Sequence, residues 1–174
     1  MPNRMTERYA VTQKYLMTRG QAINFPYQYF ETNFKKNEVF GVVIDIPMSA
    51  TVLTTMVCFI NGAANLYFNN GGDYTGASQR YRTLVQAAHN LVANATQLVP
   101  KCTKTKKYDL PKGMTQKIYL LTKSGIFTTE VKPGIIPEDQ PELRSFYVLY
   151  QRVLNELRSS QLKDDAAARM NPEK

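Results

Sequence analysis

The sequence predicts an α+β fold, in which one five-stranded antiparallel sheet carries two long helices on one face. Two amphipathic stretches, 81–99 and 143–157, repeat apolar residues at the 3.6-residue period of a helix. Short β-branched or alternating runs are separated by tight turns, which favour antiparallel neighbours over parallel crossovers. The predicted order is a first helix, three strands, a long helix, two strands and a last helix.

Residues 1–36 are expected to form a helix and an aromatic segment ahead of the main domain. Helix-compatible spacing over 6–19 ends at Gly20, a residue that commonly stops a helix. Five aromatic residues follow between positions 25 and 34. We expect them to cap one end of the core as a loop or short helix, and a ligand-facing aromatic wall is the alternative.

Three strands are predicted next. The first, 39–46, is closed by Pro47, which has no amide hydrogen for a ladder. The second and third, 51–60 and 64–68, meet at the pair Asn61-Gly62, which suits a type I′ hairpin turn. Alternation places on one face of the first strand the side chains of Phe40, Val42, Ile44 and Ile46.

The second half begins with a glycine-rich turn at 69–78 and the long helix, which ends at Pro100. The stretch 101–113 is predicted to be a basic loop. Strands 116–122 and 126–131 follow and are joined by a tight turn.

The last helix is predicted from about Pro141 to Ser160, and residues 163–174 are expected to be a flexible tail. The main domain therefore spans 37–162. Its order of elements resembles the layout of profilin-like, longin-like and roadblock-like modules, a likeness of architecture that does not fix function.

The amino-acid composition excludes some classes of protein and favours others. The chain has 174 residues, a formal charge of +8 and only two cysteines, which excludes a disulfide scaffold and favours a reduced, cytoplasmic protein. Its polar start lacks a signal-peptide core. The uncharged stretch 46–72 is long enough to span a membrane, but its proline, asparagines and hydroxyl residues predict sheet instead.

No combination of residues predicts a catalytic or metal site, and no cofactor is expected. The single histidine, His89, lies off the apolar stripe, and a metal site needs further ligands. Cys58 is expected to be a packed thiol, whereas Cys102 is a weak nucleophile candidate because neighbouring lysines could lower its pKa. Asp45 is expected at a solvated strand end, with a buried general base as the alternative. An enzyme is therefore the less favoured class.

The sequence around the glycine-rich turn resembles that of other proteins. The string NLYFNNGG at 65–72, the glycine at 76, the long helix and KIYLLT at 117–122 resemble a pattern in small uncharacterised bacterial proteins. That group has no established activity, so the resemblance implies no catalytic residue. Where those proteins carry a third glycine this chain has Asp73, and where they tend to have a histidine it has Gln79 or Arg80.

We expect a protein-interaction or assembly module that forms a homodimer or binds another protein, without a membrane. A five-stranded antiparallel sheet leaves two edges and a second face, which the first helix or another subunit can mask.

Two other functions are kept open. A sensor of a nucleotide or phosphate would bind its anion at the glycine-rich turn; its candidate ligand-binding residues are Tyr67, Asn70, Gly71, Gly72, Asp73, Thr75, Gly76 and Ser78. A tight bend with a helix cap is the structural alternative for that turn. Nucleic-acid binding would use Lys101, Lys104, Lys106 and Lys107, for which solvated loop lysines are the alternative.

Overall fold

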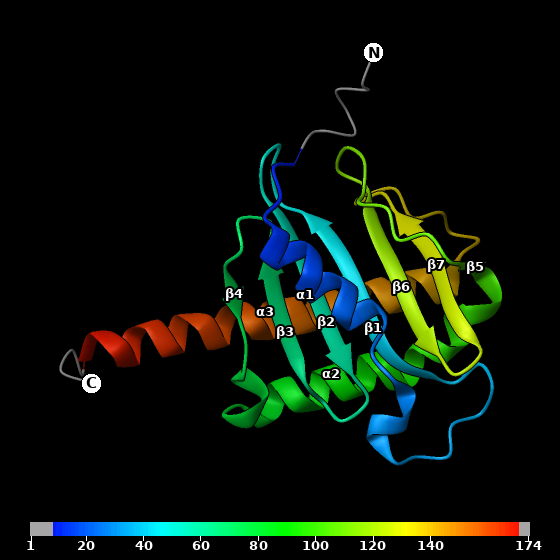
Figure 1. The fold of residues 1–174 in the computed structure, drawn as a ribbon, viewed down its shortest axis with the longest axis horizontal. Helices are drawn as coiled ribbons and strands as arrows, with labels where there is room; N and C mark the ends of the chain where they lie inside the picture. The colour runs from blue at the N-terminus through cyan, green and yellow to red at the C-terminus, as the bar shows by residue number, and fades with distance from the viewer. Residues whose placement is uncertain (1–8, 171–174) are drawn as a thin grey trace.

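The structure, a computed structural model, describes residues 9–170. Over this range the fold is α+β, with one seven-stranded antiparallel sheet in the order β4-β3-β2-β1-β6-β7-β5 and three α-helices packed against it (Figure 1). The strands are β1 (Val39–Pro47), β2 (Leu53–Phe59), β3 (Ala64–Phe68), β4 (Asp73–Tyr74), β5 (Thr103–Thr105), β6 (Gln116–Thr122) and β7 (Gly125–Val131). The α-helices are α1 (Gln13–Ile23), α2 (Arg82–Ala95) and α3 (Pro141–Met170). Three short 3-10 turns complete the fold: η1 (Tyr27–Phe30), η2 (Ala77–Gln79) and η3 (Thr96–Lys101).

The sheet has two more strands than the five predicted, and both are short strands at its edges. β4 lies within the glycine-rich turn and pairs with β3, and β5 lies in the stretch expected to be a basic loop and pairs with β7. Strands of two and three residues are too short to show an alternating pattern, so periodicity cannot find them. They also leave few free backbone groups at the two edges of the sheet.

The two faces of the sheet are covered by different helices. α2 and α3 share one core cluster with the β1 residues Val42 and Ile44, as the amphipathic stripes predict. α1 lies on the opposite face (Figure 1), where Ala22 and Ile23 pack in a second cluster with Val43. The first helix, rather than another subunit, therefore covers the second face of the central strands.

A β-bulge in β1 shows that the predicted position of Phe40 is wrong. Val39 pairs with Thr122 and Gly41 with Leu121, so β1 advances two residues while β6 advances one. Phe40 consequently turns to the α1 side instead of sharing a face with Val42, Ile44 and Ile46.

The N-terminal elements also differ in their bounds from the prediction. α1 begins at Gln13, where the Thr12 hydroxyl accepts a hydrogen bond from the amide of Tyr15. It continues through Gly20 to Ile23, so Gly20 does not stop the helix. The expected aromatic cap is confirmed, because Phe25 and other rings of the 25–34 segment pack over the second cluster.

The last helix is longer than predicted. α3 runs past Ser160 to Met170, so the tail expected to be flexible is helical as far as that residue, and 171–174 lie outside the described residues. Its distal turns project beyond β4 (Figure 1). We refer to residues 161–170 as the arm.

The β2–β3 turn is built around one glycine. Gly62 has a φ of 89°, whereas Asn61 has no positive φ, so the turn is not the predicted type I′. The turn packs directly on α2, because a Cβ at Gly62 would lie 2.4 Å from Val85 Cγ1.

Replacing Gly62 with alanine is expected to destabilise the fold more than replacing Gly134. Both glycines have positive φ, which strains alanine by about 1–2 kcal/mol. At Gly134 nothing lies within 4 Å of the added Cβ, whereas at Gly62 the Cβ meets Val85. In urea titrations the free energy of unfolding should fall by about 2–4 kcal/mol for Gly62→Ala and about 1 kcal/mol for Gly134→Ala. Equal losses would contradict the packing of the turn on α2.

Candidate functional site

A cavity of about 800 Å³ lies at the end of the sheet where β1 begins. Its lining comes from four regions: the loop before β1 with the first residue of β1, the β2–β3 turn, the end of α2 with η3 and Cys102, and β7. Its apolar wall consists of Val39, Ile60, Ala93, Val99, Pro100, Cys102 and Phe127, and its polar rim of Lys35, Asn37, Glu38 and Thr96. We call it the α2–β7 pocket. Its volume lies within the range of about 300–1,000 Å³ that is usual for ligand sites.

Local hydrogen bonds hold the walls of this pocket in place. The amide of Val39 donates to the Thr96 hydroxyl at 3.0 Å, which ties the start of β1 to the end of α2. The Ser124 amide donates to the Lys36 carbonyl, and the Ser124 hydroxyl donates to the Asn37 side-chain oxygen at 2.7 Å. The rim loop is therefore fastened to the β6–β7 turn.

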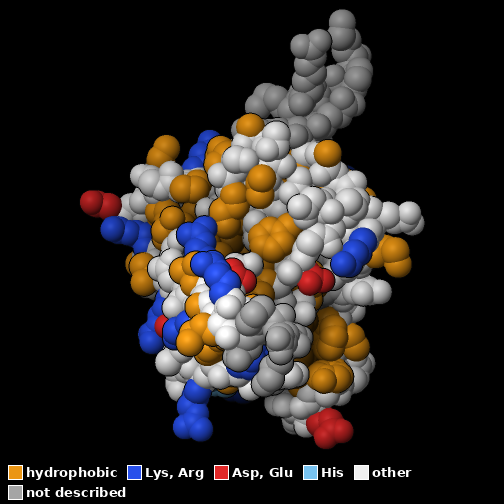
Figure 2. Space-filling view, turned by 90° about the vertical axis from the view of Figure 1, so that its left-hand side faces the viewer, with side chains coloured by type: hydrophobic (Ala, Val, Ile, Leu, Met, Phe, Trp, Pro, Cys, Tyr) orange, Lys and Arg blue, Asp and Glu red, His pale blue; other side chains and the backbone are white. Residues whose placement is uncertain are grey.

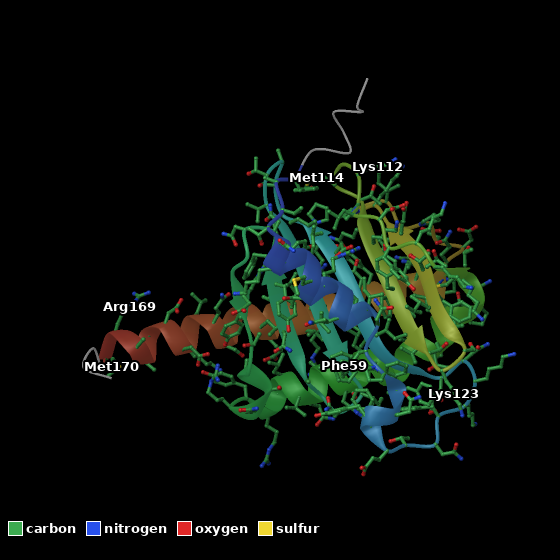
Figure 3. All side chains as sticks on the ribbon, in the orientation of Figure 1. Phe59, Lys112, Met114, Lys123, Arg169 and Met170 are labelled. Atoms are coloured by element: carbon green, nitrogen blue, oxygen red, sulfur yellow. The ribbon has the colours of Figure 1, made fainter. Side chains whose placement is uncertain are left out.

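Exposed lysines border the pocket. Lys35 belongs to its rim, and Lys36 follows it in the same loop. Lys104 stands in β5 opposite Phe127, and its side chain passes close to Gly125. Within the lining Lys35 and Glu38 balance each other, so the excess of positive charge around the pocket comes from Lys36 and Lys104 beside it. In Figure 3 Lys123 marks this end of the molecule and Lys112 the opposite end.

The two cysteines are both protonated thiols at neutral pH. Burial raises the pKa of Cys102 to about 12, and its Sγ donates to the Leu98 carbonyl. The expectation that neighbouring lysines activate this thiol is therefore wrong, because desolvation dominates. Burial likewise raises the pKa of Cys58 to about 12, and the prediction of a packed thiol is confirmed.

No histidine lies among the residues that line this pocket. His89 is exposed on α2, and its Nδ1 lies 2.7 Å from the carbonyl oxygen of Ile60. Among residues 9–170, no group of three or more histidine, cysteine and carboxylate side chains is placed to hold a metal ion.

The glycine-rich turn uses several of its amides internally. Gly71 donates to the Phe68 carbonyl, Gly72 to the Asn70 side chain and Gly76 to the Asn65 side chain. The segment forms the β3–β4 hairpin and then η2, so it does not lead straight into the long helix.

The remaining candidate residues of this turn are spread along the hairpin. Tyr67 pairs with Asp73 across β3 and β4, and burial raises the pKa of Tyr67. Asp73 adds a negative charge and lies 3.7 Å from Lys14, while Thr75 and Ser78 sit between β4 and α2. Anion binding by these glycine amides stays a prediction with little local support.

The four lysines singled out from the sequence do not lie on a single loop. Lys101 ends η3 and Lys104 lies in β5, whereas Lys106 and Lys107 begin a segment, 106–113, that crosses over β7 and β6 (Figure 1). Tyr108, the aromatic residue available for base stacking, packs edge-on against Tyr119 instead. Nucleic-acid binding stays a prediction.

Asp45 is completely buried, so the expected solvated strand end is wrong. Its carboxylate accepts hydrogen bonds from Nε and Nη2 of Arg19, the latter at 2.7 Å, and from the Thr55 hydroxyl at 2.7 Å. The Tyr15 hydroxyl lies 2.5 Å from that of Thr55. Burial, with the Asp45 charge adding to it, raises the pKa of Tyr15.

This network is a structural clamp rather than a general base with access to substrate. Arg19 is also buried, and its Nη1 donates to the Tyr108 carbonyl at 2.8 Å. One guanidinium thereby joins α1, β1 and the 106–113 segment. Sequence reasoning missed Arg19; the available signal was an isolated acid in an apolar strand, which demands a buried partner.

Comparison with protein-family models, with curated proteins and with solved structures finds no match to this chain. Among the described residues, no helix has the length and apolar character needed to cross a bilayer.

Replacing Arg19 with methionine should destabilise the fold strongly, because it leaves the buried Asp45 carboxylate without its countercharge. We expect the free energy of unfolding in urea to fall by about 3–5 kcal/mol. The double variant Arg19→Met/Asp45→Leu removes both charges and should recover a large part of that loss. A double variant less stable than Arg19→Met would show that the ion pair does not explain the effect.

Proposed function

We propose that the protein is an interaction module that binds a partner protein through the α2–β7 pocket. The partner inserts an apolar side chain and flanks it with acidic residues. The observation that carries this proposal is the combination of an apolar wall with a lysine-bearing rim in one cavity of about 800 Å³. An apolar anchor in a pocket and charged contacts at its rim are the usual anatomy of a protein interface.

The apolar wall supplies the affinity in this proposal. Ala93 and Pro100 are exposed and Ile60 is half-buried in the free protein, so an inserted side chain can remove apolar surface from water. Burying one leucine or phenylalanine side chain contributes about 1.5–3 kcal/mol. A single anchor gives weak binding, and contacts with the rim must add to it.

The charge of the chain selects an acidic partner. The formal net charge is +8, and Lys35, Lys36 and Lys104 border the pocket. A positive surface accelerates association with negative partners and repels basic ones. The same charge makes the binding depend on salt.

The chemistry of the lining favours binding over catalysis. Cys102 is protonated at neutral pH, and the Glu38 carboxylate accepts a hydrogen bond from the Lys35 amide on the rim. The pocket thus offers apolar contact and positive charge without an activated nucleophile.

A homodimer, a cytoplasmic location and kinship with the small bacterial proteins remain predictions. For a homodimer, pairing through sheet edges would have little backbone to use, because β4 and β5 have two and three residues. The α2–β7 pocket is therefore the better supported contact surface.

Filling the pocket should abolish binding of an apolar anionic probe. The probe is 1-anilinonaphthalene-8-sulfonate, whose fluorescence rises in apolar sites. Ala93→Trp places a large ring at an exposed position of the wall, and we expect at least about tenfold weaker binding, whereas Ala93→Ser should bind as the wild type does. Equal affinity in the tryptophan and serine variants would overturn the proposed site.

Charge reversal tests the rim separately. Lys35→Glu/Lys104→Glu should weaken probe binding several-fold at low salt and flatten its salt dependence. Lys112→Glu/Lys132→Glu makes the same change in net charge near Thr115, at the opposite end of β6 and β7, and should leave the affinity unchanged. Equal losses in both pairs would indicate a general charge effect and contradict a specific rim.

A photocrosslinking residue at position 93 then identifies the class of partner in cells. We expect crosslinks to another protein at a segment containing an apolar residue between acids, and their loss in Lys35→Glu/Lys104→Glu. Crosslinks to a second copy of this chain alone would overturn the distinct partner and establish the homodimer.

A further inference from the structure

Three donors converge on one carboxylate near the far end of α3. Asp164 Oδ2 accepts hydrogen bonds from the Tyr74 hydroxyl and from Arg80 Nη2, both at 2.6 Å. Asp164 Oδ1 accepts one from the Tyr81 hydroxyl at 2.5 Å. Both carboxylate oxygens are therefore bound by a single segment of the chain, 74–81, which we call the cradle.

The cradle is organised by its own contacts as well as by Asp164. Arg80 Nη1 donates to the Gly76 carbonyl at 3.2 Å, and the guanidinium lies 5.8 Å from the centre of the Tyr81 ring. The side chains of Arg80 and Asp164 are 47% and 26% exposed, so solvent and solutes can reach the pair. Arg80 is thus held beside Gly76 and Tyr81 by contacts that do not involve Asp164.

The arm depends on the cradle for its position. Ser160 is the last buried residue of α3, and beyond it Leu162 and Met170 are 68% and 82% exposed. Besides Asp164, the arm places the ammonium of Lys163 5.5 Å from the centre of the Tyr81 ring. Figure 2 views this side of the molecule, where basic and acidic side chains lie close together. A few helical turns without apolar packing are marginally stable in water, so loss of these contacts frees the arm.

We propose that the cradle is an anion-binding site which Asp164 occupies in the free protein, and that a phosphate monoester displaces Asp164 and releases the arm. The ligand must outcompete a carboxylate held at high effective concentration on the same chain. A phosphate monoester brings more negative charge and three acceptor oxygens, which match one guanidinium and two hydroxyls better than a carboxylate does.

Protonation of Asp164 cannot release the arm near neutral pH. Hydrogen bonds from Arg80, then from Tyr74 and Tyr81, lower the pKa of Asp164 to about 2. The carboxylate stays ionised across the physiological range, so displacement requires a competing anion. This inference is independent of the α2–β7 pocket and uses side chains rather than the glycine amides of the preceding turn.

The test measures binding of inorganic phosphate and of glycerol 3-phosphate by titration calorimetry, at constant ionic strength set with chloride. Asp164→Ala empties the cradle, and we expect at least about tenfold tighter phosphate binding than in the wild type. Arg80→Ala added to Asp164→Ala should abolish it. Asp165→Ala removes the neighbouring exposed acid and should behave as the wild type does.

Hydrogen exchange of residues 161–170 reports the arm itself. Exchange should be fast in Asp164→Ala and should become fast in the wild type at saturating phosphate. Phosphate affinity that is equal in Asp164→Ala and in Asp164→Ala/Arg80→Ala would overturn the anion site and leave Asp164 as a structural fastening. If Asp164→Ala proves unstable by circular dichroism, Asp164→Asn serves in its place. Ala93→Trp should not affect phosphate binding, so failure of the pocket proposal is distinguishable from failure of this one.

Discussion

The buried ion pair between Arg19 and Asp45 is the constraint that joins α1 and the 106–113 segment to the centre of the sheet. Asp45 is fully buried in β1, the middle strand of the seven. A charge in that position is tolerable only with a hydrogen-bonded countercharge, and α1 supplies it. The same guanidinium donates to the Tyr108 carbonyl, so the ion pair also fixes the 106–113 segment over the sheet. One face of the central strands is thus covered by α1, with both this polar clamp and the second apolar cluster, and the other face by the apolar stripes of α2 and α3.

Because helices cover both faces of the central strands, a partner or ligand can reach the sheet mainly at its ends. The edge strands β4 and β5 are too short to offer much backbone pairing. The pocket where β1 begins and the arm beyond β4 are two accessible features at these ends. Both features lie where an element ends: α2 passes into η3 at the pocket, and α3 continues past its last buried residue at the arm.

Periodicity predicted the elements that bury apolar side chains and missed those that do not. α2, α3 and the strands β1, β2, β3, β6 and β7 were predicted from apolar patterns and the turns between them, whereas β4 and β5 are too short for any pattern. Phe40 fits the alternation of β1, but the bulge turns it to the other face. The candidate sites were harder to predict, because the α2–β7 pocket gathers Lys35, Ala93 and Phe127 from distant parts of the sequence.

The sequence analysis did not identify Asp164, because a helical segment held by hydrogen bonds rather than by apolar packing shows no apolar stripe in its sequence. The arm contains three successive alanines and charges of both signs but few large apolar residues, a composition that indicates a tail in isolation. It becomes helical in continuation of a well-packed helix and is held by Tyr74, Arg80 and Tyr81. Of these donors, Tyr74 ends β4 and Arg80 and Tyr81 directly precede α2, whereas Ala93 in the pocket wall lies near the end of α2. α2 is anchored between them by the fully buried Leu84, Leu91 and Val92. Close packing makes α2 a stiff element that runs from the cradle at its start to the pocket wall near its end.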